Sequence, residues 1–191
     1  DGIEIIDMDN YPEFDDMVAA FVERRKGKVN DEEARKILKD ANFFGTMLTY
    51  MDKVDGMVSG AVHSTADTVR PALQIVKTRP GVPRTSGSFL MLRGETRYLF
   101  ADCAINIELD AEGLAGVAVE SARMAKMFGI DPKVAMLSLS TKGSAKHDLI
   151  TKVQDATRMA KELAPDMVID GELQFDAAVS ETVAKQKAPG S

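Results

Sequence analysis

The stretch that decides the fold is residues 134–171, VAMLSLSTKGSAKHDLITKVQDATRMAKELAPDMVIDG. An apolar run opens it, a polar loop follows at 141–146, and a second apolar run, MVIDG, closes it. The segment between the loop and the second run, residues 148–163, has the length and pattern of a helix. Strand, helix and strand in this order predict a β-α-β unit with parallel strands. The stretch therefore indicates an α/β fold.

The sequence on either side continues the alternation. Upstream, the apolar runs SFLML (88–92) and RYLFA (97–101) flank RGET, which is the pattern of a β-hairpin. Residues 111–128 then have an amphipathic pattern that predicts a helix, and a last helix is expected from about residue 175. In the first part of the chain we expect strands at 3–6 and 54–62 and helices at 12–26, 32–40, 42–52 and 68–77.

The connector TRPGVPRTSG, residues 78–87, is rich in proline and glycine and marks the expected domain boundary. We therefore predict two α/β lobes, residues 1–79 and residues 80–191, each with a sheet flanked by helices and largely parallel strands.

Composition narrows the class of protein. The chain has 191 residues, of which 45% are hydrophobic and 28% charged, with a net charge of −6. Its basic residues are scattered, whereas a nucleic-acid-binding protein normally carries a basic face. The single cysteine, Cys103, excludes an intramolecular disulfide and suits a reducing cytosol. Since no apolar run approaches the ~20 residues that a bilayer requires, we expect a cytoplasmic protein without a membrane partner.

The segment HSTADTVRP, residues 63–71, is the first candidate site. We expect the helix to start at Thr68, which leaves Pro71 in the first turn. Hydroxyl groups at a helix start can donate to an oxyanion, as Ser64, Thr65 and Thr68 could, and Arg70 can form two bonds to a phosphate or carboxylate. An alternative remains: the hydroxyls only cap the helix, and Arg70 pairs with an acidic neighbour.

The loop STKGS, residues 140–144, is the second candidate. It lacks the leading glycine and the spacing of a P-loop, so nucleotide hydrolysis is not expected. No metal is expected either, because the two histidines have no third ligand at a recognisable spacing. Asp170, Glu172 and Asp176 could be bases, or they could be a polar loop and a helix cap. The basic run ERRKGK, residues 23–28, is typical of a solvated helix end.

Several blocks together resemble one known family. SGAVHSTADTVRPALQIVKT, YLFADCAIN, PKVAMLSLSTKGSAK, LAPDMVIDGELQFDAAV and the closing KAPGS are similar to the bacterial phosphate acetyltransferase (phosphotransacetylase) family, from residue 1 to residue 191. The resemblance implies interconversion of acetyl-CoA and phosphate with CoA and acetyl phosphate. It also implies two α/β/α lobes like those of the isopropylmalate dehydrogenase-like fold, with the active site in a cleft between them.

The resemblance assigns residues to the site. The arginine of the block HSTADTVRP is Arg70, and a second family arginine matches Arg25, with Arg24 as the neighbouring choice. The residues expected to bind CoA or phosphate are Arg25, Ser64, Thr65, Thr68, Arg70, Ser140, Thr141, Lys142 and Ser144. CoA is a substrate, no cofactor is expected, and the family relation implies a homodimer.

This sequence departs from the family at its ends. Family members begin earlier and continue past APGS to a block, N-D-L-S-R-G, with the aspartate regarded as the base. The chain is therefore expected to be a middle section, inactive alone, with its base beyond Ser191. Two alternatives remain open: an acyl-CoA-sensing domain like that of malic enzymes, and a phosphate butyryltransferase.

Overall fold

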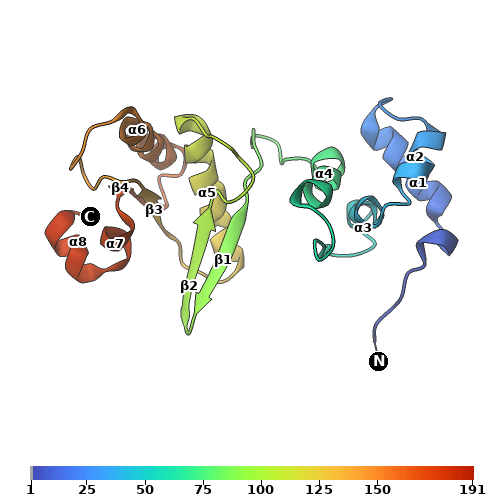
Figure 1. Cartoon of the computed structure of the whole chain (residues 1–191), viewed down its shortest axis with the longest axis horizontal. Coiled ribbons are helices and arrows are strands. Elements are labelled where there is room, and N and C mark those ends of the chain that lie inside the picture. Colours follow the sequence, from blue (N-terminus) through green and yellow to red (C-terminus); the bar gives the residue numbers. More distant parts are fainter. Residues whose placement is uncertain (1) are drawn as a thin grey trace. The chain divides into compact units, whose positions relative to one another are not determined.

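The computed structural model describes residues 2–191 (Figure 1). The chain divides into two compact units, unit 1 (Asp1–Arg79) and unit 2 (Pro80–Ser191). The division falls inside the connector that is rich in proline and glycine.

Unit 1 is built from helices. They are the 3₁₀ helix η1 (Met8–Asn10) and the α-helices α1 (Phe14–Arg25), α2 (Asp31–Ile37), α3 (Ala41–Tyr50) and α4 (Thr65–Ile75). Local chemistry explains where they start. Asn30 and Glu33 form a reciprocal capping box at α2, and the Asp40 carboxylate accepts two backbone N–H groups at α3. The first three predicted helices are confirmed, with ends shifted by up to three residues.

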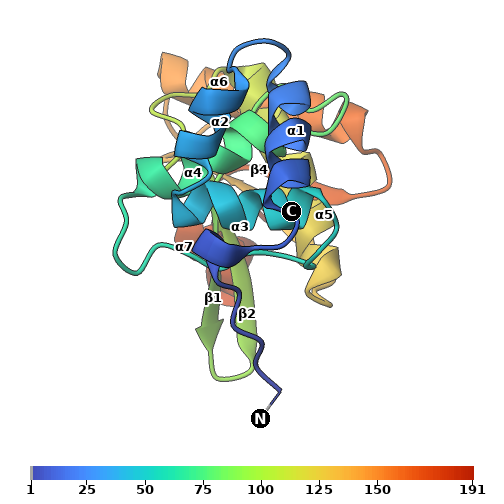
Figure 2. The same ribbon diagram turned by 90° about the vertical axis from the view of Figure 1, so that its right-hand side faces the viewer.

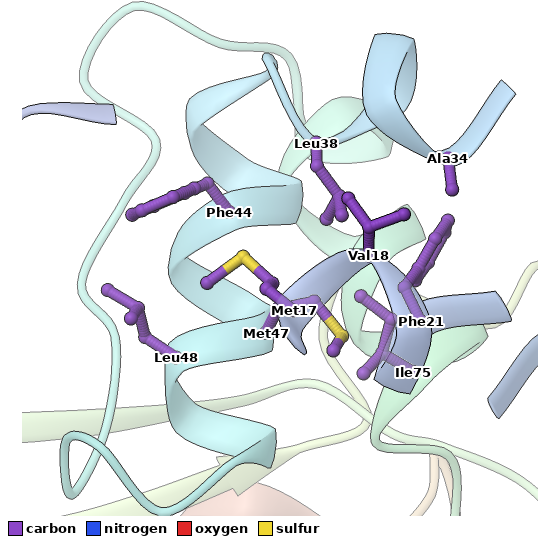
Figure 3. Packing of buried hydrophobic residues seen from close by; sticks show 9 residues of the cluster. All are labelled: Met17, Val18, Phe21, Ala34, Leu38, Phe44, Met47, Leu48 and Ile75. Carbon is purple, nitrogen blue, oxygen red and sulfur yellow. The ribbon is translucent and has the colours of Figure 1, made fainter. Parts of the chain in front are cut away.

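Helices α1 and α2 lie side by side (Figure 2), and the core of unit 1 is formed mainly by α1 and α3. Figure 3 shows Met17, Val18 and Phe21 of α1 packed toward Met47 of α3, with Ile75 of α4 beside them. All five side chains are fully buried. Burying a side chain of this size contributes about 1.5–3 kcal/mol, so this cluster is the main stabilising contact of the unit.

The predicted strands at 3–6 and 54–62 are wrong, and residues 2–79 contain no strand. Ile3, Ile5, Val58 and Val62 are almost entirely exposed. The 54–62 segment has no neighbouring strand in unit 1 with which it could form backbone hydrogen bonds. It is held to α3 instead, where Met57 lies against Thr46, with Sδ 3.8 Å from the Thr46 hydroxyl. The prediction of a sheet in each lobe therefore fails for unit 1.

Helix α4 starts three residues earlier than predicted, because Ser64 and not Thr68 is its cap. Pro71 therefore lies inside the helix and is buried. Proline has no N–H, so the carbonyl of Asp67, four residues earlier, loses its helical partner. The buried Asn42 side chain donates to that carbonyl (Nδ2–O 3.3 Å). A side chain of α3 thus replaces the missing helical hydrogen bond and ties the two helices together.

Unit 2 contains strands and helices. They are β1 (Ser88–Arg93), β2 (Thr96–Ala101), α5 (Ala111–Met127), β3 (Lys133–Leu137), α6 (Asp148–Leu163), β4 (Val168–Leu173), α7 (Phe175–Val179) and α8 (Glu181–Lys187). The predicted hairpin is confirmed as the antiparallel pair β1–β2, which lies beside α5 (Figure 1). Its side chains are largely exposed, Phe89 and Leu92 among them.

The predicted β-α-β unit is also confirmed, because β3 and β4 form a parallel pair and α6 connects them along the chain. The core beneath them combines Met136 and Ile169 of the strands with small residues of α5 and α6, such as Ala118, Ala156 and Ala160. The sheet is only two strands wide, so close helix packing supplies much of its support.

Asp170 of β4 links the strand to the 140–144 loop, to Ser191 and to α6 through ion pairs and a hydrogen bond. Its carboxylate accepts hydrogen bonds from the Lys142 ammonium (2.6 Å) and the Ser191 hydroxyl, and Lys161 of α6 lies 3.4 Å away. Partial burial raises the pKa of Asp170, but the bonds from Lys142 and Ser191 outweigh it and lower the pKa to about 2.

The Asn42–Asp67 contact can be tested by a double-mutant cycle. Asn42→Ala should lower the free energy of unfolding by about 0.5–1.5 kcal/mol, because it removes the part-buried hydrogen bond to the Asp67 carbonyl. In a Pro71→Ala background the same change should cost less, since alanine at 71 restores the helical N–H donor to that carbonyl. Chemical denaturation measures the free energy of unfolding of the wild type, the two single variants and the double variant. Equal costs in the two backgrounds would contradict the assigned contact.

Asp170 should make stability depend on pH. Its folded pKa lies below the unfolded value, so the ionised carboxylate stabilises the fold above about pH 4, and that stabilisation disappears as pH falls toward 2. Asp170→Asn should cost roughly 2 kcal/mol at pH 7 and little at pH 2. Thermal melts over this range measure the difference. Asp155→Asn, at an exposed α6 carboxylate that faces Arg158, is the control and should follow the wild-type pH profile.

Candidate functional site

The start of α4 places the first group of predicted residues. The Ser64 hydroxyl accepts from the Asp67 backbone N–H (3.2 Å) and donates to the Asp67 carboxylate (2.7 Å). The Thr68 hydroxyl donates to the Ser64 carbonyl at 3.1 Å, while Thr65 is exposed in the first turn. Ser64 and Asp67 thus bond each other at the helix start, where Thr65 is exposed.

Arg70 lies in the second turn of α4 and not in the first turn as predicted. The interaction with the helix dipole falls off within the first turn, so the predicted conflict with the dipole is weak. Its guanidinium lies 3.7 Å from the Asp67 carboxylate, and its side chain is 57% exposed. An exposed pair at this distance contributes about 0–1 kcal/mol, so most of the donor capacity of Arg70 remains available to a ligand.

The end of α1 separates the roles of the two adjacent arginines. Arg24 donates to the carbonyls of Ile75 and Val76 at the end of α4, and its guanidinium lies 5.0 Å from the centre of the Tyr50 ring. The Nε atom of Arg25 is buried and has no hydrogen-bond partner in the described chain. Arg24 is therefore a packing residue, and Arg25 is the arginine with donor capacity left.

Positive charge gathers where α1 and α4 end. Partial desolvation lowers the pKa of Lys77, and the neighbouring charges of Arg24, Lys26, Arg25 and Lys28 lower it further. A lysine destabilised in its charged form by other cations favours binding of an anion, which would relieve the repulsion. Arg70 is five residues before Ile75, which corresponds to roughly 7.5 Å along the helix axis. Unit 1 thus carries one exposed cation, Arg70, in the second turn of α4 and a cluster of cations near the end of that helix.

The 140–144 loop follows β3 in unit 2. Ser140 and Thr141 are buried. The Thr141 hydroxyl accepts from the Gln174 N–H at 2.9 Å and lies 3.2 Å from its side-chain oxygen, and the Ser144 hydroxyl accepts from the Thr141 N–H at 3.0 Å. The Ser140 hydroxyl donates to Glu172 at 3.0 Å. These hydrogen bonds, among five residues, hold the loop in one defined shape without a ligand.

Lys142 of the same loop is engaged by β4. Its ammonium bonds the Asp170 carboxylate and the Gly171 carbonyl, at 2.6 and 3.1 Å. Its binding role stays a prediction, as do those of Ser140, Thr141 and Ser144.

Sequence reasoning missed two residues that shape these sites, Asn42 and Lys77. It names Glu172 only as one of three acidic residues that could be bases or part of a polar loop. A buried carboxylate among polar neighbours has no distinctive spacing, so its contacts could not be inferred from the sequence. Among residues 2–191 no cluster of three or more histidine, cysteine or acidic side chains could hold a metal ion. No helix in that range is both long and apolar enough to cross a bilayer.

The amino-acid sequence of the chain is similar to that of known proteins. The sequence model of the family described as phosphate acetyl/butaryl transferase matches residues 1–191. A phosphate acetyltransferase of Bacillus subtilis is 62% identical over 190 residues, and one of Staphylococcus epidermidis is 61% identical over 194. These alignments cover 100% and 99% of this chain and 59% of each relative, so the chain spans about three fifths of their length.

Solved structures give the same result. The EutD phosphotransacetylase from Staphylococcus aureus superposes with a TM-score of 0.91 at 58% identity, over 99% of this chain and 58% of its own. A phosphotransacetylase from Streptococcus pyogenes superposes with a TM-score of 0.90 at 59% identity, over 98% and 57%. The match along the whole sequence and the agreement in structure establish that the chain belongs to the phosphate acetyl/butaryl transferase family.

Proposed function

We propose that the protein carrying this chain transfers an acetyl group between CoA and inorganic phosphate. The observation that carries the proposal is the identity of about 60% to relatives named phosphate acetyltransferase. The geometry of unit 1 supports it, because Arg70 and Arg25 both retain donor capacity for an anion.

The reaction needs charge neutralisation more than a nucleophilic side chain. Toward acetyl phosphate, a phosphate oxygen attacks the thioester carbonyl, the new C–O bond forms, the C–S bond breaks, and CoA leaves as a thiolate that takes up a proton. In the other direction a base must remove the thiol proton, since a thiol of pKa ~8.5 is mostly protonated at neutral pH. Guanidinium groups stabilise the phosphate and the oxyanion that forms at the carbonyl.

We assign the binding steps to this chain. Arg70 forms the two-pronged contact with phosphate, and Thr65 donates its hydroxyl at the start of α4. Ser64 and Thr68 shape that start through their own hydrogen bonds. Arg25, within the basic cluster, neutralises a second anionic group of CoA. The base belongs to the part of the family pattern that residues 1–191 do not match.

The choice of acetyl over butyryl rests on the relatives, because the family description covers both. The same relatives are enzymes by name, which favours catalysis over a domain that only senses acyl-CoA. The assay that tests the proposal is acetyl phosphate formation from acetyl-CoA and phosphate by the full-length protein, with butyryl-CoA as the competing substrate.

Four further expectations remain proposals. The full-length protein has the isopropylmalate dehydrogenase-like fold, it forms a homodimer, it works in the cytoplasm, and it needs neither a cofactor nor a metal, with CoA as substrate.

Replacing Arg70 should separate binding from stability. Arg70→Gln in the full-length enzyme should weaken use of phosphate or CoA by about 1.5–3 kcal/mol, roughly ten- to hundredfold, because a charged hydrogen-bond donor is lost. Arg70→Lys should restore this only partly, since lysine keeps the charge but not the fork. Steady-state kinetics and thermal melts on the same samples measure both effects.

Arg35→Gln is the matched control, because Arg35 is also an arginine on a helix of unit 1 and pairs with Asp15 and Asp31. It should lower stability slightly and leave the kinetics unchanged. An Arg70 variant that melts earlier yet turns over normally would show that Arg70 serves only its ion pair with Asp67.

Replacing Arg24 should affect mainly stability, whereas replacing Arg25 should affect mainly the use of CoA. Arg24→Ala should lower the free energy of unfolding by about 2–3 kcal/mol, because two charge-assisted hydrogen bonds and an aromatic contact are lost. Arg25→Ala should change stability by less than about 1 kcal/mol and raise the KM for CoA roughly tenfold or more. Denaturation curves and CoA titrations distinguish them, and a kinetic defect confined to Arg24→Ala would reverse the assignment.

A further inference from the structure

Glu172 is a buried carboxylate that the proposed reaction does not use. It is 2% exposed, and no ion pair joins it to another described residue. A buried charge is retained only where hydrogen bonds replace its lost hydration. The contacts of Glu172 therefore indicate its purpose.

An irregularity in β4 points Glu172 away from the ladder. Met136 pairs with Gly171 and the next residue, Leu137, pairs with Leu173, so Glu172 is an extra residue in the strand. Such bulges redirect a side chain. Gly171 allows this geometry, because a Cβ atom there would lie 2.6 Å from the Cβ of Met136.

The redirected carboxylate lies inside the 140–144 loop. Its Oε1 accepts the Gly143 N–H at 2.7 Å and the Ser140 hydroxyl at 3.0 Å, and its Oε2 accepts from Gln154 of α6 at 3.1 Å. The Glu172 carbonyl also accepts the Lys142 N–H at 3.1 Å. Burial raises the pKa of Glu172, but the bonds from Gly143, Gln154 and Ser140 outweigh it and hold the pKa below its ordinary value.

A loop whose backbone N–H and hydroxyl groups converge on an anion is the arrangement that elsewhere holds a phosphate. Here a carboxylate of the same chain fills that position. A second anion could not bind the same donors, because Glu172 already accepts their hydrogen bonds and its negative charge would repel the anion. The inner donors of the loop are therefore closed to substrate.

We propose that Glu172 is a positioning residue: it acts as a permanent internal anion that fixes the 140–144 loop and excludes phosphate from the inside of that loop. Substrate then meets only exposed residues at the loop and after it, such as Lys146. The kinetic part of this inference rests on the proposed function.

Removal of the carboxylate should open an anion-binding hole. In the full-length protein, Glu172→Ala should raise the KM for phosphate about tenfold with less than about a threefold change in kcat, because the loop and not the reacting groups has changed. Added formate should lower the KM of this variant most of the way back to the wild-type value, and chloride at equal ionic strength should not. Asp155→Ala is the matched control, since it removes an exposed carboxylate of α6 that pairs with Arg158 and has no contact with the 140–144 loop among the hydrogen bonds of the described chain. Wild type with formate controls for inhibition.

A second measurement does not depend on activity. The amide proton resonance of Gly143 should follow the protonation of Glu172 in wild type and should shift upfield in Glu172→Gln, since its acceptor loses charge. This readout decides the assignment even if Glu172→Ala does not fold, or if the wild-type protein transfers no acetyl group.

The proposal is overturned by any of three results: an unchanged KM in Glu172→Ala, equal restoration by formate and chloride, or a Gly143 resonance that ignores both pH and the Gln substitution. A wild-type protein without acetyl transfer would instead refute the proposed function and leave the Gly143 result to stand.

Discussion

Unit 2 depends on how a parallel sheet only two strands wide is held together. A pair of this width cannot be stable by its ladder alone. The β3–β4 pair is completed by its crossover connection, since alanines let α6 pack closely beneath it and Gly171 lets β4 approach Met136. The polar loop after β3 then closes over β4 through the Glu172 carboxylate and the Lys142–Asp170 pair. The residues that stabilise the fold are therefore the ones that surround the candidate site.

Unit 1 solves a different problem with one side chain. Pro71 interrupts the hydrogen bonds of α4 just after Arg70, where the proposed ligand would bind. Asn42 compensates from α3, and the Ser59 hydroxyl donates to the same amide. The backbone around Arg70 is thus fixed from a neighbouring helix, and the guanidinium itself is left exposed.

The sequence predicted features that depend on local periodicity. The hairpin at 88–101, the β-α-β unit and most of the helices are of this kind, because apolar spacing and turn residues specify them within a few positions. The strand at 54–62 failed because its valines have strand propensity but no neighbouring strand to pair with. The predicted start of α4 is wrong because Ser64 and Thr68 are both good caps, and only the hydrogen bond from the Asp67 N–H to the Ser64 hydroxyl distinguishes them. The contacts of Glu172 cross about thirty residues, so no local pattern reveals them.

The hairpin β1–β2 has a consequence for how this chain behaves at high concentration. Among the described residues its two strands pair with each other and with no third strand, so each has an outer edge without a ladder partner, and Phe89 and Leu92 are exposed. Edges of this kind template further strands from other molecules. Arg93 and Arg97, near the turn, place like charges on neighbouring copies and oppose such stacking. We therefore expect added salt to favour pairing between hairpins of different molecules, because salt screens the repulsion between these arginines and leaves the strand edges unpaired.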